Sequence, residues 1–176
     1  RAERIGVARV YFEHILKLRD LVARHGRRIM MWGDIVQKHP EIVPEIPKDI
    51  LMLDWFYNPA TAEARRMRSA GNRLFREAGL ETINCPGTNT WVTLACRTEM
   101  ARSNIRWFSG LAEKNGARGM LLTDWGDDGH MNLQGFSLYP LAIGADAAWH
   151  GGADDSPEFD RAFSYLCFAD AEGRVA

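Results

Sequence analysis

The sequence predicts an α/β fold: the C-terminal half of a (β/α)8 TIM barrel, followed by a short helical extension. Helical and strand-like segments alternate four times along the 176 residues, which is typical of a parallel sheet covered by helices. The predicted strands end in Trp and Asp residues, and barrel enzymes carry their chemistry at these strand ends. A doubly wound sheet that binds nucleotides would usually carry a glycine-rich phosphate loop, and the sequence has none.

A helix is predicted before the first strand, over residues 3–25. Tyr11, Ile15 and Leu18 recur at helical spacing and give this segment one apolar face. Gly26 follows directly and is a typical C-terminal stop. The first strand therefore begins shortly after this glycine.

Four short apolar runs predict parallel strands that are buried on both faces. They cover residues 28–32, 50–55, 81–85 and 119–124. The first and last runs both end in Trp-Gly-Asp, at 32–34 and 125–127. Because a complete barrel has eight strands, four strands make half of one.

The segments between and after the strands are predicted to be mostly helical. They are a broken helix with three prolines at 39–47 and helices at 62–78, 94–114 and 137–149. The arginines of the predicted helix at 62–78 are interpreted as a solvated face. They are Arg65, Arg66, Arg68, Arg73 and Arg76.

Two parts of the chain are expected, the half barrel at residues 1–150 and the start of a post-barrel helical segment at 151–176. Gly151 and Gly152 mark the boundary between them. Ser156 is the expected N-cap of the last helix, with Pro157 in its first turn.

The composition excludes several classes of partner. The chain is 46% hydrophobic with a formal net charge of −1, so neither a nucleic acid nor a membrane is expected as a partner. Its apolar runs are shorter than the ~20 residues of a membrane helix. The cysteines and histidines lack metal-ligand spacing, so no metal or cofactor is expected. The chain begins with Arg1 rather than Met, which suggests a fragment.

Tryptophans at strand ends predict a pocket for a sugar. Trp32 and Trp55 end the first and second runs, Trp125 directly follows the fourth, and Trp91 lies in the loop after the third. Indole faces can pack against the C–H faces of a pyranose ring, although a single Trp more often fills a core. Several tryptophans at equivalent strand ends favour a binding site instead.

Acidic residues near the same strand ends are the predicted partners of the sugar hydroxyls. Asp34 and Asp127 each follow a Trp-Gly step, and a carboxylate accepts several hydrogen bonds. His130 is a further candidate for binding a hydroxyl or a carboxylate. Asp54 and Asp124 directly precede a Trp, so strand alternation points their side chains to the other face.

Three groups of motifs resemble bacterial family 20 glycoside hydrolases, the β-N-acetylhexosaminidases, over roughly residues 5–150. The motifs are Met30-Met31-Trp32-Gly33-Asp34-Ile35 with Lys38-His39-Pro40-Glu41 and Pro47-Lys48-Asp49, then Asn84-Cys85-Pro86-Gly87-Thr88 with Trp91, and finally Leu122-Thr123-Asp124-Trp125-Gly126-Asp127-Asp128-Gly129-His130. Their order and spacing together carry the resemblance.

The resemblance implies that the last four strands of the barrel are present. In the family, tryptophans after strands five, six and eight wall the pocket around the N-acetyl group, and Trp32, Trp55 and Trp125 match them. Asp127 matches an acidic residue that binds sugar hydroxyls, which is Glu in many members. Many members also have a Tyr that contacts the acetamide oxygen, but residues 85–91 contain no Tyr.

The family mechanism is substrate-assisted, with the acetamide oxygen as nucleophile. An adjacent Asp-Glu pair after strand four orients the acetamide and supplies the general acid. The chain contains no Asp-Glu dipeptide, so no catalytic residue is assigned here. The acid is expected from the missing N-terminal half of the barrel. A non-catalytic carbohydrate-binding barrel and a different TIM-barrel glycosidase are the alternatives.

Overall fold

A four-stranded parallel sheet forms the centre of the protein. The computed structural model describes residues 2–59, 61–152 and 157–174. The strands are paired in the order in which they occur along the chain. They are β1 (Met30–Trp32), β2 (Leu51–Trp55), β3 (Thr82–Cys85) and β4 (Gly119–Met120). The predicted mixed α/β architecture with a parallel sheet is therefore confirmed.

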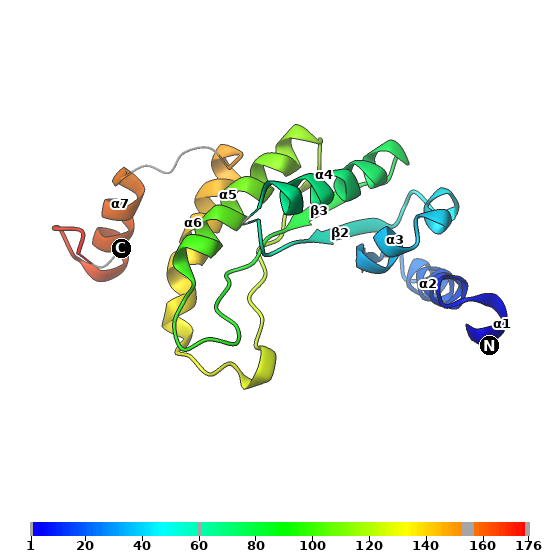
Figure 1. The fold of residues 1–176 in the computed structure, drawn as a ribbon, viewed down its shortest axis with the longest axis horizontal. Helices are drawn as coiled ribbons and strands as arrows, with labels where there is room; N and C mark the ends of the chain where they lie inside the picture. Colours follow the sequence, from blue (N-terminus) through cyan, green and yellow to red (C-terminus); the bar gives the residue numbers. More distant parts are fainter. Residues whose placement is uncertain (1, 60, 153–156, 175–176) are drawn as a thin grey trace.

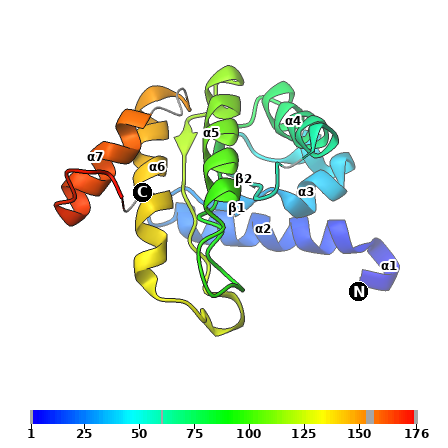
Figure 2. The ribbon, with the colours of Figure 1, turned by 60° about the vertical axis from the view of Figure 1, so that its left-hand side comes forward.

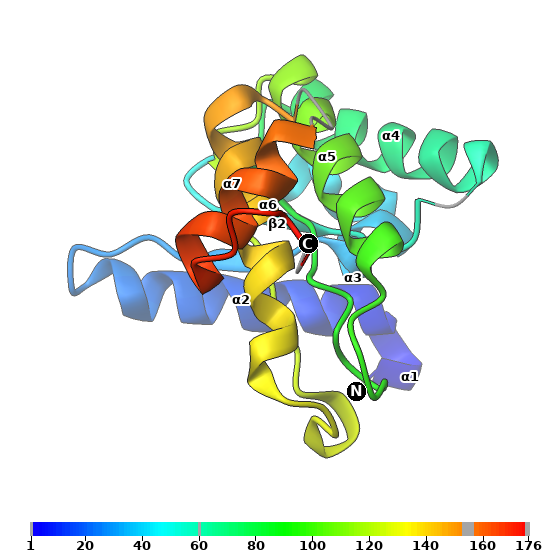
Figure 3. The same cartoon turned by 90° about the vertical axis from the view of Figure 1, so that its left-hand side faces the viewer.

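Helices precede, connect and follow the strands. They are α1 (Ala2–Ile5), α2 (Val7–Ala23), α3 (Asp34–Lys38), α4 (Ala62–Glu77), α5 (Thr98–Lys114), α6 (Leu138–His150) and α7 (Pro157–Phe168), with short 3-10 helices η1 (Pro40–Glu45), η2 (Asp127–Gly129) and η3 (Gln134–Ser137). Figure 1 shows α4 and α5 along the same side of β2 and β3. From α3 to α7 the helices follow one another across the molecule (Figure 2). In the view of Figure 3, α2 lies behind α6, and Figure 1 shows α2 at the other end of the molecule from α5 and α6. None of the helices described here combines the length and apolar character that crossing a bilayer requires.

The predicted helix at 3–25 is interrupted. Gly6 separates α1 from α2 with a φ of 84°, a conformation that costs glycine little because it has no Cβ atom. The predicted helix at 94–114 begins only at Thr98. The proline-rich segment forms the expected broken helix, η1. The Ser156 cap lies outside the described residues, and α7 follows it as expected.

The fourth strand is shorter than predicted. Its regular pairing stops at Met120, opposite Asn84. Leu121 N still donates to Asn84 O at 3.0 Å, and Thr123 N donates to Pro86 O at 2.9 Å. Because Pro86 has no N–H to donate, the ladder continues as single hydrogen bonds rather than as a regular strand.

The core lies on the helix side of the sheet. Met31 and Met52 are buried there together with residues from α2, α3, η1 and α4, such as Phe12, Val36 and Phe75. A second apolar cluster joins α5 to α6. The first cluster covers the helix side of β1 and β2, and α5 packs against β3 and β4.

The opposite face of the sheet is partly open. Met30 in β1 is 57% exposed and Leu121, next to β4, is 42% exposed. Leu51 and Leu53 in the middle of the sheet are buried. The prediction that every strand is buried on both faces is therefore wrong for the outer strands, since no other element covers this side of Met30 and Leu121 among the described residues.

This open face leads to a prediction about association. We expect the 176-residue chain alone to self-associate, or to unfold without a sharp transition, because exposed sheet edges and apolar patches favour association. Sedimentation velocity over a range of protein concentrations measures the self-association. Met30→Lys with Leu121→Lys should shift the chain toward monomer. A monomeric parent chain with a sharp thermal transition would contradict the prediction.

Candidate functional site

One pocket gathers most of the predicted site residues. It has a volume of about 420 Å³ and is lined by Trp32, Asp34, Trp55, Tyr57, Trp91, Trp125 and Asp127. We call it the aromatic pocket. Six of these residues were predicted from the sequence, and Tyr57 was not.

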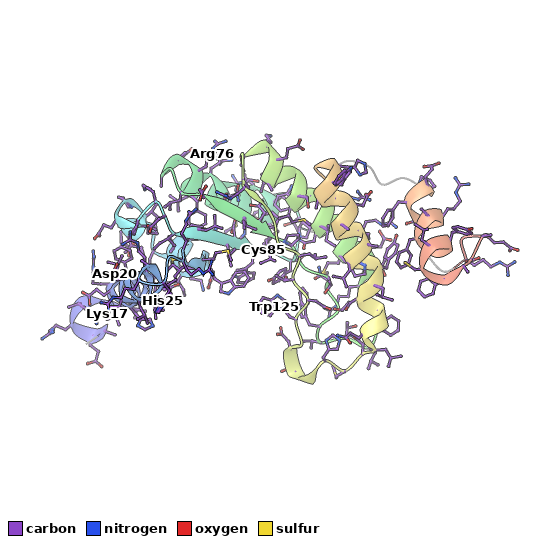
Figure 4. The ribbon with its side chains drawn as sticks, turned by 180° about the vertical axis from the view of Figure 1, so that it is seen from behind. Lys17, Asp20, His25, Arg76, Cys85 and Trp125 are labelled. Atoms are coloured by element: carbon purple, nitrogen blue, oxygen red, sulfur yellow. The ribbon has the colours of Figure 1, made fainter. Side chains whose placement is uncertain are left out.

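The pocket lies at the carboxyl edge of the sheet. Trp32 ends β1 and Trp55 ends β2, whereas Trp91 and Trp125 lie in the segments after β3 and β4. Figure 4 shows Cys85 at the tip of β3 and Trp125 beyond it, on the segment that follows β4. Because the strands are parallel, their carboxyl ends bring these side chains to one edge.

Tyr57 links the tryptophans of the pocket. Its ring stacks on Trp55, with 5.1 Å between centroids and 24° between planes, and meets Trp91 edge-on at 4.9 Å. Trp32 and Trp125 form a second pair at 5.8 Å. These separations lie in the range of favourable aromatic contacts. Five rings therefore form a shared wall.

The Tyr57 hydroxyl connects this wall to the segment after β4. Trp125 Nε1 donates to Tyr57 Oη at 2.7 Å, and Thr123 Oγ1 lies 3.3 Å from Tyr57 Oη. Thr123 Oγ1 also lies 3.0 Å from Pro86 O, which is the other acceptor within its reach. When Thr123 donates to Tyr57 Oη, as Trp125 does, Tyr57 keeps its own proton available for an acceptor in the pocket.

The environment of Tyr57 keeps its hydroxyl protonated. Burial raises the pKa of Tyr57, the hydrogen bonds from Thr123 and Trp125 act against this, and the charge of Asp127 raises the pKa further. A signal for this residue was present in the sequence. Tyr57 follows Trp55 by two positions, so alternation places both side chains on the same face.

Two carboxylates complete the pocket. Asp34 is the first residue of α3, and Asp127 is the first residue of η2. Of the described residues, no lysine, arginine or histidine lines the pocket. The pocket therefore offers apolar ring faces, hydrogen-bond acceptors and one hydroxyl donor, which suits a neutral ligand that carries hydroxyl groups.

The remaining candidates lie outside the pocket. His130 is not among its lining residues, and its Nδ1 lies 3.4 Å from Trp125 O. Asp54 points to the helix side of the sheet, where Arg68 Nη1 lies 2.6 Å from its Oδ1. Asp124 binds two threonines of the loop after β3. The prediction that Asp54 points away from Trp55 is confirmed.

Gly87 permits the close contact between two of the rings. A Cβ atom here would lie 2.7 Å from Trp91 Cη2 and 2.8 Å from Tyr57 Cδ1. We expect Gly87→Ala to push these rings apart and alter the near-UV circular dichroism, with the far-UV spectrum unchanged. Gly135→Ala is the matched control, since nothing lies within 4 Å of its Cβ position. Equal near-UV spectra for the parent and Gly87→Ala would contradict this prediction.

Comparisons with known proteins do not identify the site. No family model matches the chain, and a search of the curated proteins gives no match. Within residues 2–59, 61–152 and 157–174, no group of three or more His, Cys, Asp and Glu residues is placed to hold a metal ion. The aromatic pocket is therefore the candidate functional site.

Proposed function

We propose that this chain is the C-terminal half of a glycosidase barrel related to the family 20 β-N-acetylhexosaminidases. In this proposal the aromatic pocket holds the terminal N-acetylhexosamine of a substrate. The sequential order of the parallel strands supports the barrel, because neighbouring strands of a (β/α)8 barrel follow one another along the chain. The open face of the sheet would then be the barrel interior.

The convergence of five aromatic rings and two carboxylates at the strand ends carries the proposal. Indole rings can cover the apolar faces of a pyranose. Asp34 and Asp127 would accept hydrogen bonds from its hydroxyls, and charged acceptors make such bonds strong.

Tyr57 would contribute the donor that residues 85–91 lack. Its hydroxyl lies in the wall of the pocket and holds a proton for an acceptor, as described above. The carbonyl oxygen of an acetamide is an acceptor of the right kind. Holding this oxygen would orient the group that serves as nucleophile in substrate-assisted hydrolysis.

The general acid would come from the other half of the barrel. The chain has no Asp-Glu dipeptide. Among the described residues β1 and β4 are the outer strands of the sheet, so the strands of the other half would pair with their free edges. In this proposal the described residues bind and orient the sugar, and proton transfer to the leaving group takes place on a carboxyl group outside this chain.

Hydrolysis by the longer polypeptide that contains this chain tests the proposal. We expect release of 4-nitrophenol from the N-acetyl-β-glucosaminide and much slower release from the plain β-glucoside. Trp55→Ala should abolish this activity. Trp149→Ala should retain it, since Trp149 lies on α6 with 86% of its surface exposed. Absence of hydrolysis, or equal hydrolysis of the two substrates, would reject the proposal.

A carbohydrate-binding barrel without catalysis is the second candidate. It is favoured by the fact that the rings and carboxylates of the aromatic pocket already come together in a chain that contains no Asp-Glu pair. Binding of methyl N-acetyl-β-glucosaminide without hydrolysis by the longer polypeptide would select this candidate. Equal hydrolysis of the plain glucoside would instead favour a different barrel glycosidase.

A further inference from the structure

Asp124 joins the two segments that carry Trp91 and Trp125. Its Oδ1 accepts hydrogen bonds from Thr88 Oγ1 at 2.6 Å and from Thr90 Oγ1 at 2.7 Å. Both threonines are fully buried. We call these three residues the Asp124 clamp. It connects the loop after β3 to the segment after β4 through side chains.

Backbone contacts support the same connection. Thr88 N donates to Thr123 O at 2.9 Å, and Gly87 pairs with Thr123 in an isolated parallel bridge. Asn132 Nδ2 donates to Thr90 O, and Ser137 Oγ lies 3.3 Å from Thr90 Oγ1. The loop after β3 is therefore held from several sides. Two charged groups take part, the Asp124 carboxylate in the clamp and the Arg97 guanidinium, which donates to Trp91 O at 3.1 Å and to Val92 O at 3.0 Å.

The clamp lies directly beside the aromatic pocket without lining it. Thr90 precedes Trp91 and Asp124 precedes Trp125, and both tryptophans line the pocket whereas the clamp residues do not. Trp91 in turn meets Tyr57, which accepts the hydrogen bond from Trp125. Loss of the clamp contacts would therefore alter the aromatic pocket by moving the Trp91 ring.

We propose that Asp124 is a positioning residue, which holds Trp91 against Tyr57 by binding Thr88 and Thr90. The effect on ligand affinity rests on the proposed function, whereas the effect on the position of Trp91 does not. A carboxylate suits this task because it accepts both hydroxyls, and hydrogen bonds to a charged acceptor are stronger than neutral ones.

Asp124 stays charged at neutral pH. Burial acts to raise its pKa, but hydrogen bonds from Thr88, Thr90 and Ser137 and the nearby His130 outweigh it and hold the pKa of Asp124 below its usual range. The clamp is therefore fully formed under the conditions of the experiments below.

Matched variants of the two threonines test the clamp. Thr88→Val with Thr90→Val keeps the side-chain shape and removes both hydroxyls, whereas Thr88→Ser with Thr90→Ser keeps the hydroxyls. Asp124→Ala removes the acceptor. Each is made in the longer polypeptide, with and without Trp91→Phe, so that the fluorescence and acrylamide quenching of Trp91 are obtained by difference.

We expect the valine pair and Asp124→Ala to shift the emission of Trp91 and make it more accessible to acrylamide. The serine pair should resemble the parent. Affinity for methyl N-acetyl-β-glucosaminide, measured by titration calorimetry, should fall about tenfold in the valine pair and in Asp124→Ala. With Trp91→Phe present, the same changes should alter the affinity less than about twofold, because coupled residues are not additive.

Two results would overturn the proposal. One is an unchanged Trp91 signal in Asp124→Ala and in the valine pair. The other is an equal loss of affinity with and without Trp91, which would mean that Asp124 supports the fold in general. If the parent does not bind the glycoside, the proposed function fails for that sugar, and the Trp91 signal still decides the role of Asp124.

Discussion

Replacing Arg68 with methionine is expected to lower the free energy of unfolding by about 3–5 kcal/mol, the usual cost of leaving one partner of a buried ion pair alone. Asp54 is fully buried, and the Arg68 side chain is 14% exposed. Gln37 Nε2 and Asn72 Nδ2 also donate to the Asp54 carboxylate, at 2.8 and 3.0 Å. Without Arg68 these neutral amides would be its remaining partners among the contacts described here. Urea unfolding of the longer polypeptide, followed by circular dichroism, measures the loss.

Two control variants separate this effect from a general loss of arginine. Arg66→Met on the same helix should change stability by no more than about 0.5 kcal/mol, because Arg66 is exposed. Arg68→Met combined with Asp54→Asn should recover about half of the loss, since the amide removes the unpaired charge and still accepts hydrogen bonds. A loss below about 1 kcal/mol for Arg68→Met alone would contradict the prediction.

The pH dependence gives an independent check. Burial raises the pKa of Asp54, although Arg68, Asn72 and Gln37 act against this. Removing Arg68 should raise the pKa of Asp54 further. When an acid has a higher pKa in the folded than in the unfolded protein, the free energy of unfolding falls as the pH rises from the unfolded pKa through the folded pKa. The free energy of unfolding of Arg68→Met should therefore lie only slightly below that of the parent near pH 4, and the difference should grow toward neutral pH.

This network contradicts one prediction made from the sequence. The arginines at 62–78 were interpreted as a solvated face, but Arg68 reaches Asp54 and Gln37. The charge pattern of a helix does not reveal a buried acid on a neighbouring strand. Asp54 itself was correctly predicted to point away from Trp55, because strand alternation is a local rule. Its partner depends on how α4 packs, which is a property of the tertiary structure.

The same distinction applies to the candidate site. Trp32 and Trp55 were found because each ends an apolar run, and the strand order followed from the alternation of elements. Tyr57 was not predicted as a site residue because it follows the expected strand, which ends at Trp55, although its position two residues later was informative. Contacts between loops, such as Thr88 with Asp124, have no local sequence signal because the two residues lie 36 positions apart.

Tyr57 is the residue whose loss should affect the aromatic pocket most. Its ring contacts Trp55 and Trp91, and its hydroxyl accepts the hydrogen bond from Trp125. Tyr57→Ala removes all three contacts at once. We expect affinity for methyl N-acetyl-β-glucosaminide to fall at least about thirtyfold, which corresponds to about 2 kcal/mol, as for a central residue of a binding site.

Tyr57→Phe separates the hydroxyl from the ring. It keeps the stacking on Trp55 but leaves Trp125 Nε1 and, under the proposed function, the acetamide oxygen of the ligand without their partner. We expect a fall of about tenfold for methyl N-acetyl-β-glucosaminide and less than about twofold for methyl β-glucoside, because only the first ligand has the acetamide acceptor. Titration calorimetry on the longer polypeptide provides both values.

Tyr165→Phe is the matched control, since Tyr165 lies on α7 and is 61% exposed. It should leave both affinities unchanged. If Tyr57→Phe weakened both glycosides equally, its hydroxyl would serve the pocket by holding Trp125 rather than by binding the acetamide. If Tyr57→Ala bound as tightly as the parent, the wall of five rings would not be the binding surface, because this ring connects Trp55 with Trp91 and Trp125.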